Sequence, residues 1–157
     1  MSATAAKLGA NNKPVYNYDS LALKWDDADS TSNYLVFNFQ LKHSYAPGTD
    51  IYPHVHYQQT STADTVEFFI IRYRWTNTGA KQSPTFTRIQ SNNQTVLPYI
   101  GGSMHQIAEF APISGAGKSE SSILDIRLYC WADGEIYTKE FDIHFQINKP
   151  GTYNEYP

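Results

Sequence analysis

The sequence predicts an all-β protein, a single-domain antiparallel β-sandwich with a jelly-roll-like arrangement. Several segments alternate apolar and polar residues with the period of two that a β-strand requires. Short runs of Gly, Pro, Asn, Ser and Thr separate these segments, and no segment has a convincing helical periodicity. A chain of 157 residues is long enough to bury a core of its own, so we expect one domain.

The predicted strands follow from this alternation, taken along the chain. The strongest candidates are residues 34–41, 51–58, 66–75, 123–131 and 136–148. Weaker candidates are residues 15–18, 85–90, 95–97 and 104–110, while residues 21–25 fit either a strand or one helical turn. Segment 66–75 is apolar on both faces over its first half, which predicts a central strand. Asp133–Gly134 predicts a β-hairpin between the last two strong strands.

The domain boundaries and the core follow from the same pattern. Residues 1–13 are small and polar without periodicity, so we expect a flexible N-terminal arm before a sandwich domain of residues 14–157. The apolar faces of the strong strands predict a common core made by Phe37, Phe39, Ile71, Leu124, Ile126, Leu128, Phe141, Ile143 and Phe145.

The amino-acid composition argues against some classes of binding partner. Only 17% of the residues are charged, whereas 15% are aromatic and 12 are tyrosines. This balance favours a protein whose surface is largely used for contacts with other protein molecules. The net charge is −3 and no basic cluster is present, so direct binding of nucleic acid is not expected. No apolar run reaches the roughly 20 residues of a membrane span, and the first residues lack the apolar core of a signal peptide. We therefore expect no membrane partner and synthesis in the cytoplasm.

No arrangement typical of nucleophilic catalysis is found. Cys130, the only cysteine, lies in an apolar strand and is expected to pack rather than react. A Gly-x-Ser-x-Gly elbow is absent. Asp125 and Arg127 share a strand face and suit a structural ion pair, and residues 115–118 match a phosphate loop only in part. These segments therefore give no catalytic nucleophile, and no catalytic residue and no cofactor are assigned from them.

Histidines form the main candidate site. His54 and His56 are one residue apart on a predicted strand, so their side chains share a face. The segment from Gly48 to His56 is similar to the opening of the first cupin motif, but Thr60 and Ser61 stand where a cupin has its glutamate.

Two further histidines complete the set of candidate metal ligands. His105 loosely matches the second cupin motif after Pro98 and a glycine, and His144 lies on the polar face of the last predicted strand. The candidates are therefore His54, His56, His105 and His144. We favour a hydrogen-bonded cluster without metal, in which Asp142 and Asn148 supply partners on the face of His144.

The histidine segments also carry a resemblance to a known group. The segment PHVHYQ at 53–58 and the ending from SSILDIRLYCW to FDIHFQINKPGTYNE resemble a family of small tailed-bacteriophage and prophage proteins. That family has a P-H-x-H strand, a later histidine and a closing F-D-x-H strand. The likeness covers residues 48–155, and all four candidate histidines fall on matching positions. Asn148 stands where an aspartate is usual, and Gly151–Thr152 replaces Gly-Ser.

The resemblance implies a non-enzymatic structural subunit of a bacteriophage virion, placed at the capsid surface, neck or tail. Its expected partners are copies of itself and other virion proteins, and its expected location is the virion after synthesis in the host cytoplasm. The alternative is a cupin-like metal-binding protein or enzyme that uses His54 and His56 with His105 or His144. A carbohydrate-binding module forms a third class, because exposed aromatic rings on a sandwich can stack on sugars.

Overall fold

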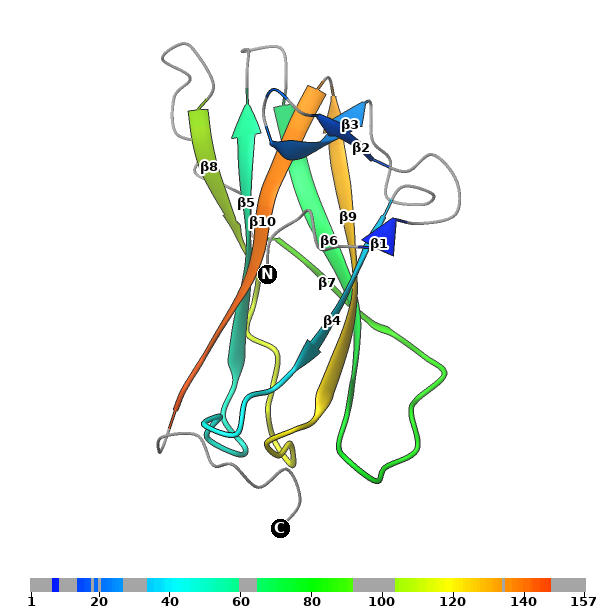
Figure 1. Cartoon of the computed structure of the whole chain (residues 1–157), viewed down its shortest axis with the longest axis vertical. Coiled ribbons are helices and arrows are strands. Elements are labelled where there is room, and N and C mark those ends of the chain that lie inside the picture. Colours follow the sequence, from blue (N-terminus) through cyan, green and yellow to red (C-terminus); the bar gives the residue numbers. More distant parts are fainter. Residues whose placement is uncertain are drawn as a thin grey trace.

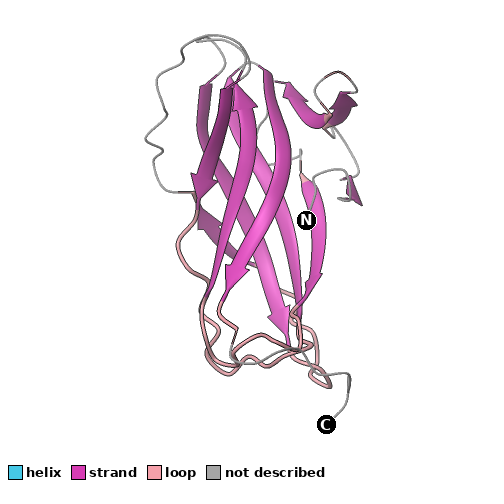
Figure 2. Ribbon diagram, turned by 60° about the vertical axis from the view of Figure 1, so that its left-hand side comes forward, coloured by secondary structure: helices cyan, strands magenta, loops and turns pink. Residues whose placement is uncertain are grey.

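The computed structural model describes residues 7–8, 14–17, 19, 21–26, 34–59, 65–91, 104–133 and 135–147. Within these residues the chain forms two antiparallel sheets of elongated strands (Figure 1, Figure 2). The histidine sheet has the order β2 (Val15–Asn17), β3 (Ala22–Asp26), β10 (Glu135–Phe145), β5 (Ile51–Gln59) and β8 (Met104–Glu109). The arginine sheet has the order β1 (Lys7–Leu8), β4 (Leu35–Gln40), β9 (Ile123–Asp133), β6 (Thr65–Thr76) and β7 (Thr87–Gln90).

The order of the strands is that of a jelly roll. Strands β6 and β7 pair with each other, and outward from them β5 pairs with β8, β4 with β9 and β3 with β10. These nested pairs correspond to one long two-stranded ribbon. Rolling that ribbon up places β10 beside β5 in one sheet and β9 beside β6 in the other. The short strands β1 and β2 extend the sheets by pairing with β4 and β3. The predicted all-β, jelly-roll-like sandwich is thus confirmed.

The core lies between the two sheets and follows the alternation of the strands. On β5 every second residue from Ile51 to Gln59 is buried, and the intervening residues are not. Six of the nine predicted core residues are buried, namely Phe37, Ile71, Leu124, Ile126, Leu128 and Phe141. Phe39, Ile143 and Phe145 pack against this core but are only partly buried. They line a pocket between β4 and β10, where the edge of the sandwich is open.

The connection between β9 and β10 differs from the predicted hairpin. β9 pairs with β4 and β6, whereas β10 pairs with β3 and β5, so the chain changes sheets between Asp133 and Glu135. Each of these strands has an apolar face and gains two neighbours by lying in the middle of its own sheet. An Asp-Gly pair indicates a sharp reversal, but it does not determine whether the two strands then pair.

Two segments that the sequence did not assign clearly to a strand form short strands in the structure. Residues 21–25, which fitted either a strand or a helical turn, form most of strand β3, and β6 is flanked by β9 and β7 as a central strand. Within the predicted N-terminal arm, Lys7 and Leu8 pair with β4 as β1. The rest of that arm and the predicted strand at 95–97 lie outside the described residues. The described part of the chain contains no helix that is long and apolar enough to span a membrane.

Candidate functional site

The candidate site lies on the outer face of the histidine sheet, and strand β5 supplies its first two residues. Pro53, Val55 and Tyr57 point into the core, so His54 and His56 between them point outward. Their shared face is therefore a direct consequence of the alternation read from the sequence. Both side chains are partly exposed, with 12% and 21% of their surface accessible.

A β-bulge in β10 brings the acidic partner to the same face. Thr138 faces Tyr57 and Glu140 faces His56, which leaves Lys139 as an extra residue in the strand. Before the bulge the fully buried residues are Ile136 and Thr138, with even numbers; after it the fully buried residue is Phe141, with an odd number. Because of this switch Asp142, which is the register partner of His54, faces outward.

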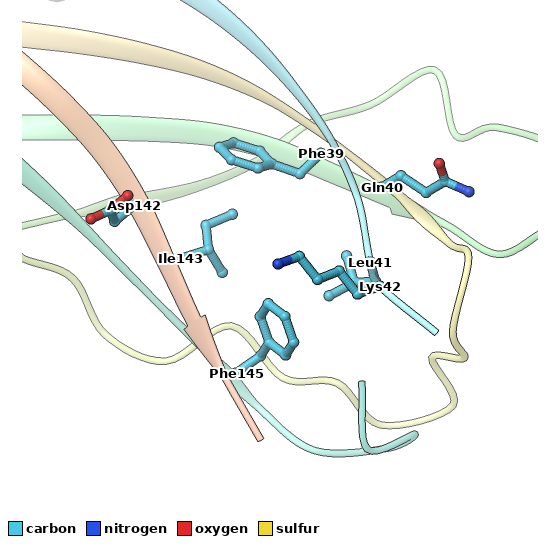
Figure 3. Close-up of a pocket in the computed structure, with 7 residues that line it drawn as sticks. All are labelled: Phe39, Gln40, Leu41, Lys42, Asp142, Ile143 and Phe145. Carbon is cyan, nitrogen blue, oxygen red and sulfur yellow. The ribbon is translucent and has the colours of Figure 1, made fainter. Parts of the chain in front are cut away.

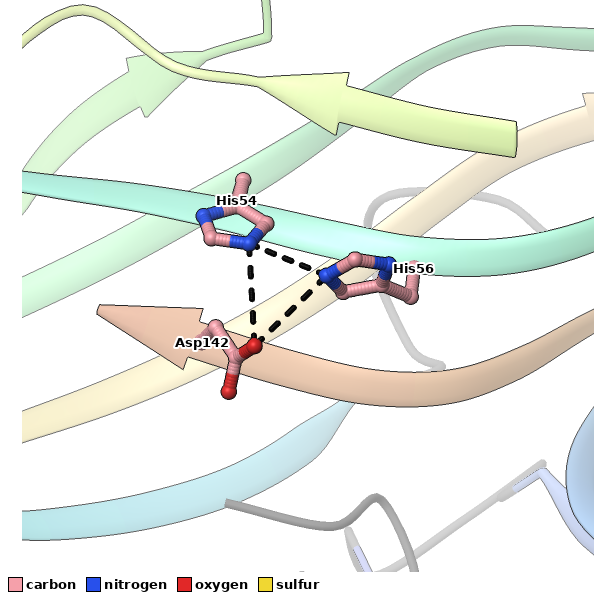
Figure 4. Close-up of side chains that lie close together, drawn as sticks. All are labelled: His54, His56 and Asp142. Carbon is pink, nitrogen blue, oxygen red and sulfur yellow. Dashed lines mark hydrogen bonds and ion pairs between the residues drawn. The ribbon is translucent and has the colours of Figure 1, made fainter. Parts of the chain in front are cut away.

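Three side-chain atoms converge at one point on this face (Figure 4). His54 Nε2 lies 3.0 Å from His56 Nε2. Asp142 Oδ2 lies 3.6 Å from His54 Nε2 and 3.5 Å from His56 Nε2. These atoms form a nearly equilateral triangle, called here the His-His-Asp triangle. Both distances to the carboxylate exceed the roughly 2.7–3.2 Å of an ordinary N–H···O hydrogen bond.

The other two candidate histidines flank the triangle. His105, from the edge strand β8, places its Nε2 2.7 Å from Nδ1 of His56. The ring of His144 lies 4.6 Å from that of His54, with their planes nearly perpendicular. All four predicted candidates are thus brought together. The fifth histidine, His43, lies elsewhere and contacts the Ser121 hydroxyl.

Asp142 had been expected only as a hydrogen-bond partner of a histidine. The structure makes it the third corner of the triangle, and no bulge was predicted that would have aligned it with His54. The outward parity of Asp142 and His144 was visible in the sequence, because both alternate with Phe141 and Ile143. Asn148, Pro98 and the two glycines of the loose second cupin motif lie outside the described residues.

The electrostatic surroundings favour the neutral form of His54. Burial lowers the pKa of this imidazole, and the neighbouring His144 and His56 lower it further. Asp142 and a hydrogen bond with the Tyr52 backbone act in the opposite direction but do not outweigh these effects. A neutral imidazole has a lone pair available, which is the form that binds a metal ion.

A pocket of about 260 Å³ adjoins the triangle. Its wall includes His54 and His144 on one side and Ile107 and Glu109 of β8 on the other. Tyr52 and Ile107 at this pocket are 45% and 44% exposed, so apolar and aromatic surface lies next to the histidines. The surface beside the histidines is therefore suited to contact with another molecule.

A second pocket, of about 220 Å³, opens between β4 and β10 (Figure 3). Phe39, Ile143 and Phe145 make its apolar wall, and Lys42 and Asp142 lie at its rim. Asp142 therefore borders this pocket as well as the triangle. The pocket explains why three of the predicted core residues are only partly covered.

The arginine sheet presents a different outer face. Arg127, Arg72 and Arg88 are register partners on β9, β6 and β7. Aromatic rings cover two of them: Arg72 lies 5.0 Å from the centre of the Tyr129 ring, and Arg127 lies 4.5 Å from that of Phe86. Such contacts offset part of the repulsion between like charges on neighbouring strands.

Asp125 and Cys130 of strand β9 have structural roles. Asp125 binds Arg74 across the strands at 2.8 Å, rather than Arg127 on its own strand. Asn38 and Gln82 donate further hydrogen bonds to the same carboxylate. Cys130 is fully buried, and burial raises the pKa of its thiol, so it packs as predicted.

The loop at 115–118 was predicted to be a loop rather than a phosphate site. Lys118 Nζ donates a hydrogen bond of 2.9 Å to the backbone carbonyl of Trp75. This contact ties the loop to the end of β6, which is a structural role for the lysine.

The comparisons with known proteins concern the fold. No protein-family model and no curated protein matches the sequence. Among solved structures, the chain is similar to CBM28, a carbohydrate-binding module specific for non-crystalline cellulose. The two share 12% identity with a TM-score of 0.37, and the match covers 80% of this chain and 76% of the module. It is also similar to a cycloisomaltooligosaccharide glucanotransferase from Paenibacillus sp., with 17% identity and a TM-score of 0.40. This match covers 90% of this chain and 17% of the enzyme.

A third similar structure is an arabinose-bound GH51 α-L-arabinofuranosidase, with 12% identity, a TM-score of 0.33 and coverage of 91% of this chain and 22% of the enzyme. The chain thus spans about a fifth of the length of the two enzymes.

Proposed function

We propose that this protein is a non-enzymatic structural subunit of a bacteriophage virion, at the capsid surface, neck or tail. It acts there through contacts with copies of itself and with other virion proteins. The observation that carries the proposal is the convergence of His54, His56, His105 and His144, the residues that bear the resemblance to phage proteins. They come from three strands and meet on one exposed face, so the matching positions form a single physical unit.

The chemistry of that face supports a role in contacts between copies. Tyr52 and Ile107 expose apolar and aromatic surface beside the histidines, and such residues are enriched in protein interfaces. Strand β8 is at the edge of the sheet and, in the described part of the chain, pairs only with β5. An edge strand with open hydrogen-bonding groups can bind a second chain. We therefore take a second copy of this protein as the molecule that covers the face.

Composition of purified phage particles tests the proposal. Particles banded in a density gradient are expected to contain the chain at a fixed number of copies that survives high-salt washing. Its absence from such particles, while it is abundant in the lysate of the same infected cells, would contradict the virion role.

A cupin-like metal-binding protein or enzyme is the second candidate. One observation favours it: the His-His-Asp triangle lies beside a pocket of about 260 Å³. Asp142 offers the carboxylate that the sequence lacks at Thr60 and Ser61. This candidate predicts a metalloprotein that is found in the lysate and not in particles, so elemental analysis combined with particle composition separates the two functions.

A further inference from the structure

We propose that His54, His56 and Asp142 bind a divalent first-row transition-metal ion, such as Zn²⁺, through His54 Nε2, His56 Nε2 and Asp142 Oδ2. The inference goes beyond the virion role and does not depend on it, because a metal site can stabilise a structural subunit or serve an enzyme. It also departs from the hydrogen-bonded cluster favoured from the sequence.

The size of the triangle fits the bond lengths of a metal ion. A circle through three points separated by 3.0, 3.5 and 3.6 Å has a radius of about 2.0 Å, against the roughly 2.0–2.2 Å bonds of Zn²⁺ to imidazole and carboxylate. An ion at bonding distance from all three atoms thus lies close to their plane. No movement of the strands is needed to form the site.

A hydrogen-bonded cluster without metal fits these distances less well. A proton between the two Nε2 atoms explains their separation of 3.0 Å, but it leaves Asp142 Oδ2 at 3.5 and 3.6 Å, beyond hydrogen-bonding distance of either ring. A cation at the centre attracts all three atoms together. The three distances therefore fit one shared cation better than one shared proton.

Both histidine ligands have hydrogen-bond partners behind them. His105 Nε2 lies 2.7 Å from Nδ1 of His56. In the proposed site the proton of this hydrogen bond is on His56 Nδ1, which leaves the lone pair of Nε2 for the metal ion. His54 makes a hydrogen bond with the Tyr52 backbone. Partners of this kind orient the rings of metal-binding histidines and select their tautomers. Here His105 is a positioning residue, not a ligand.

Paired strands hold the three ligands rigidly. The three ligands lie on β5 and β10, which pair from Ile136–Gln59 to Phe145–Ile51 with one bulge. Ligands on paired strands are held more precisely than ligands on loops. With three protein ligands the ion keeps open positions for water. Two imidazoles and one carboxylate favour transition-metal ions over Mg²⁺ and Ca²⁺, which prefer oxygen ligands alone.

Titration of the full chain with Zn²⁺ in a calorimeter, after dialysis against chelator, tests the site. We expect about one ion per chain, and no comparable binding of Mg²⁺. Asp142→Asn and the double variant His54→Gln/His56→Gln should each lower the affinity by roughly 100-fold or more, since loss of a supporting partner alone costs about 10–100-fold. Circular dichroism and thermal unfolding establish that each variant is folded.

Two control variants test whether the loss of Zn²⁺ binding is specific to the triangle. Glu109 and Asp142 are the register partners of His54 on opposite sides, but only Asp142 belongs to the triangle, so Glu109→Gln should bind Zn²⁺ like the wild type. His43→Gln removes a histidine outside the site and should also have no effect.

His105 has a test of its own. His105→Ala should weaken binding by about 10–100-fold, and His105→Gln should restore part of it because Gln still accepts a hydrogen bond from His56.

The proposal is overturned if the wild type binds no Zn²⁺, or if the folded Asp142→Asn and double-histidine variants bind it as tightly as the wild type. Equal losses in Glu109→Gln and Asp142→Asn would also overturn it, because they would indicate attraction by surface charge alone. Absence from phage particles is a separate result, which bears on the virion role and leaves the metal site unaffected.

Discussion

At the scale of single residues, the sandwich buries few polar groups and gives them specific partners. The indole Nε1 of Trp25, on β3, donates a hydrogen bond of 2.7 Å to the hydroxyl of Thr138 on β10. Trp25 is 1% exposed and Thr138 is 0% exposed, so water cannot replace either group. The bond therefore joins β3 to the central strand of the histidine sheet.

This bond leads to a prediction. Thr138→Val keeps the shape of the side chain but removes the acceptor, so the buried indole N–H loses its partner. The expected loss of unfolding free energy is about 1–3 kcal/mol. Thr138→Ser, which keeps the hydroxyl, is the control and should lose less. Urea unfolding followed by tryptophan fluorescence measures both, and equal stability of Thr138→Val and wild type would show that the bond is not formed in solution.

At the scale of strands, the sequence was sufficient to predict which side chains share a face of a strand. It was not sufficient to predict which strands pair with each other. Alternation correctly placed His54 and His56 on one face, and Phe141 opposite Asp142, because side-chain direction within a strand depends only on local geometry. The bulge at Lys139 was not predicted, since it is defined by the partner strand. The change of sheet between β9 and β10 was missed for the same reason: pairing depends on residues distant in the chain.

The two ends of β10 differ in burial, and this gives a second prediction. Phe141 is 0% exposed and lies 5.0 Å from the ring of Phe37, whereas Phe145 is only partly buried and lines the pocket of Figure 3. Phe141→Ala should cost about 3–5 kcal/mol of unfolding free energy, as for a fully buried phenylalanine, and Phe145→Ala should cost less. Chemical denaturation of both variants checks the order, and a larger loss for Phe145→Ala would mean that the pocket is closed in solution.

At the scale of the whole molecule, the two outer faces have different chemistry. The arginine sheet carries Arg127, Arg72 and Arg88 in register, supported by aromatic rings. The histidine sheet carries the triangle, exposed apolar side chains and the edge strand β8. The nested strand order explains how residues from distant parts of the chain come to share a face: β5 and β8 are already paired in the ribbon, and β10 comes to lie beside β5 when the ribbon is rolled up.

The proposed contact between copies gives a third prediction. Ile107 is 44% exposed on β8, beside the histidines, so Ile107→Lys places a charge in the proposed interface without disturbing the core. We expect the wild type to sediment as a homo-oligomer and the variant to shift toward monomer. Ile123→Lys, at an exposed position on the arginine sheet, is the matched control and should sediment like the wild type. A wild type that is monomeric at all concentrations would contradict the proposed contact.

Removal of the predicted arm tests a different part of the assembly. Deletion of residues 1–13 is expected to weaken self-association and to leave the sandwich folded, because strand β1 contributes only two residues to the edge of the arginine sheet. Analytical ultracentrifugation and circular dichroism together measure the two effects. Loss of the folded state in the truncated chain would show that the arm belongs to the domain itself.

The most direct test of the account is the coordination of the ion at the His-His-Asp triangle. X-ray absorption at the zinc edge, on protein loaded with one equivalent of Zn²⁺, reports the ligands and their distances. We predict two imidazole nitrogens and at least one oxygen at about 2.0–2.2 Å, with the multiple scattering typical of imidazole rings. An oxygen-only shell, identical in the wild type and in His54→Gln/His56→Gln, would contradict the convergence of these residues on one ion.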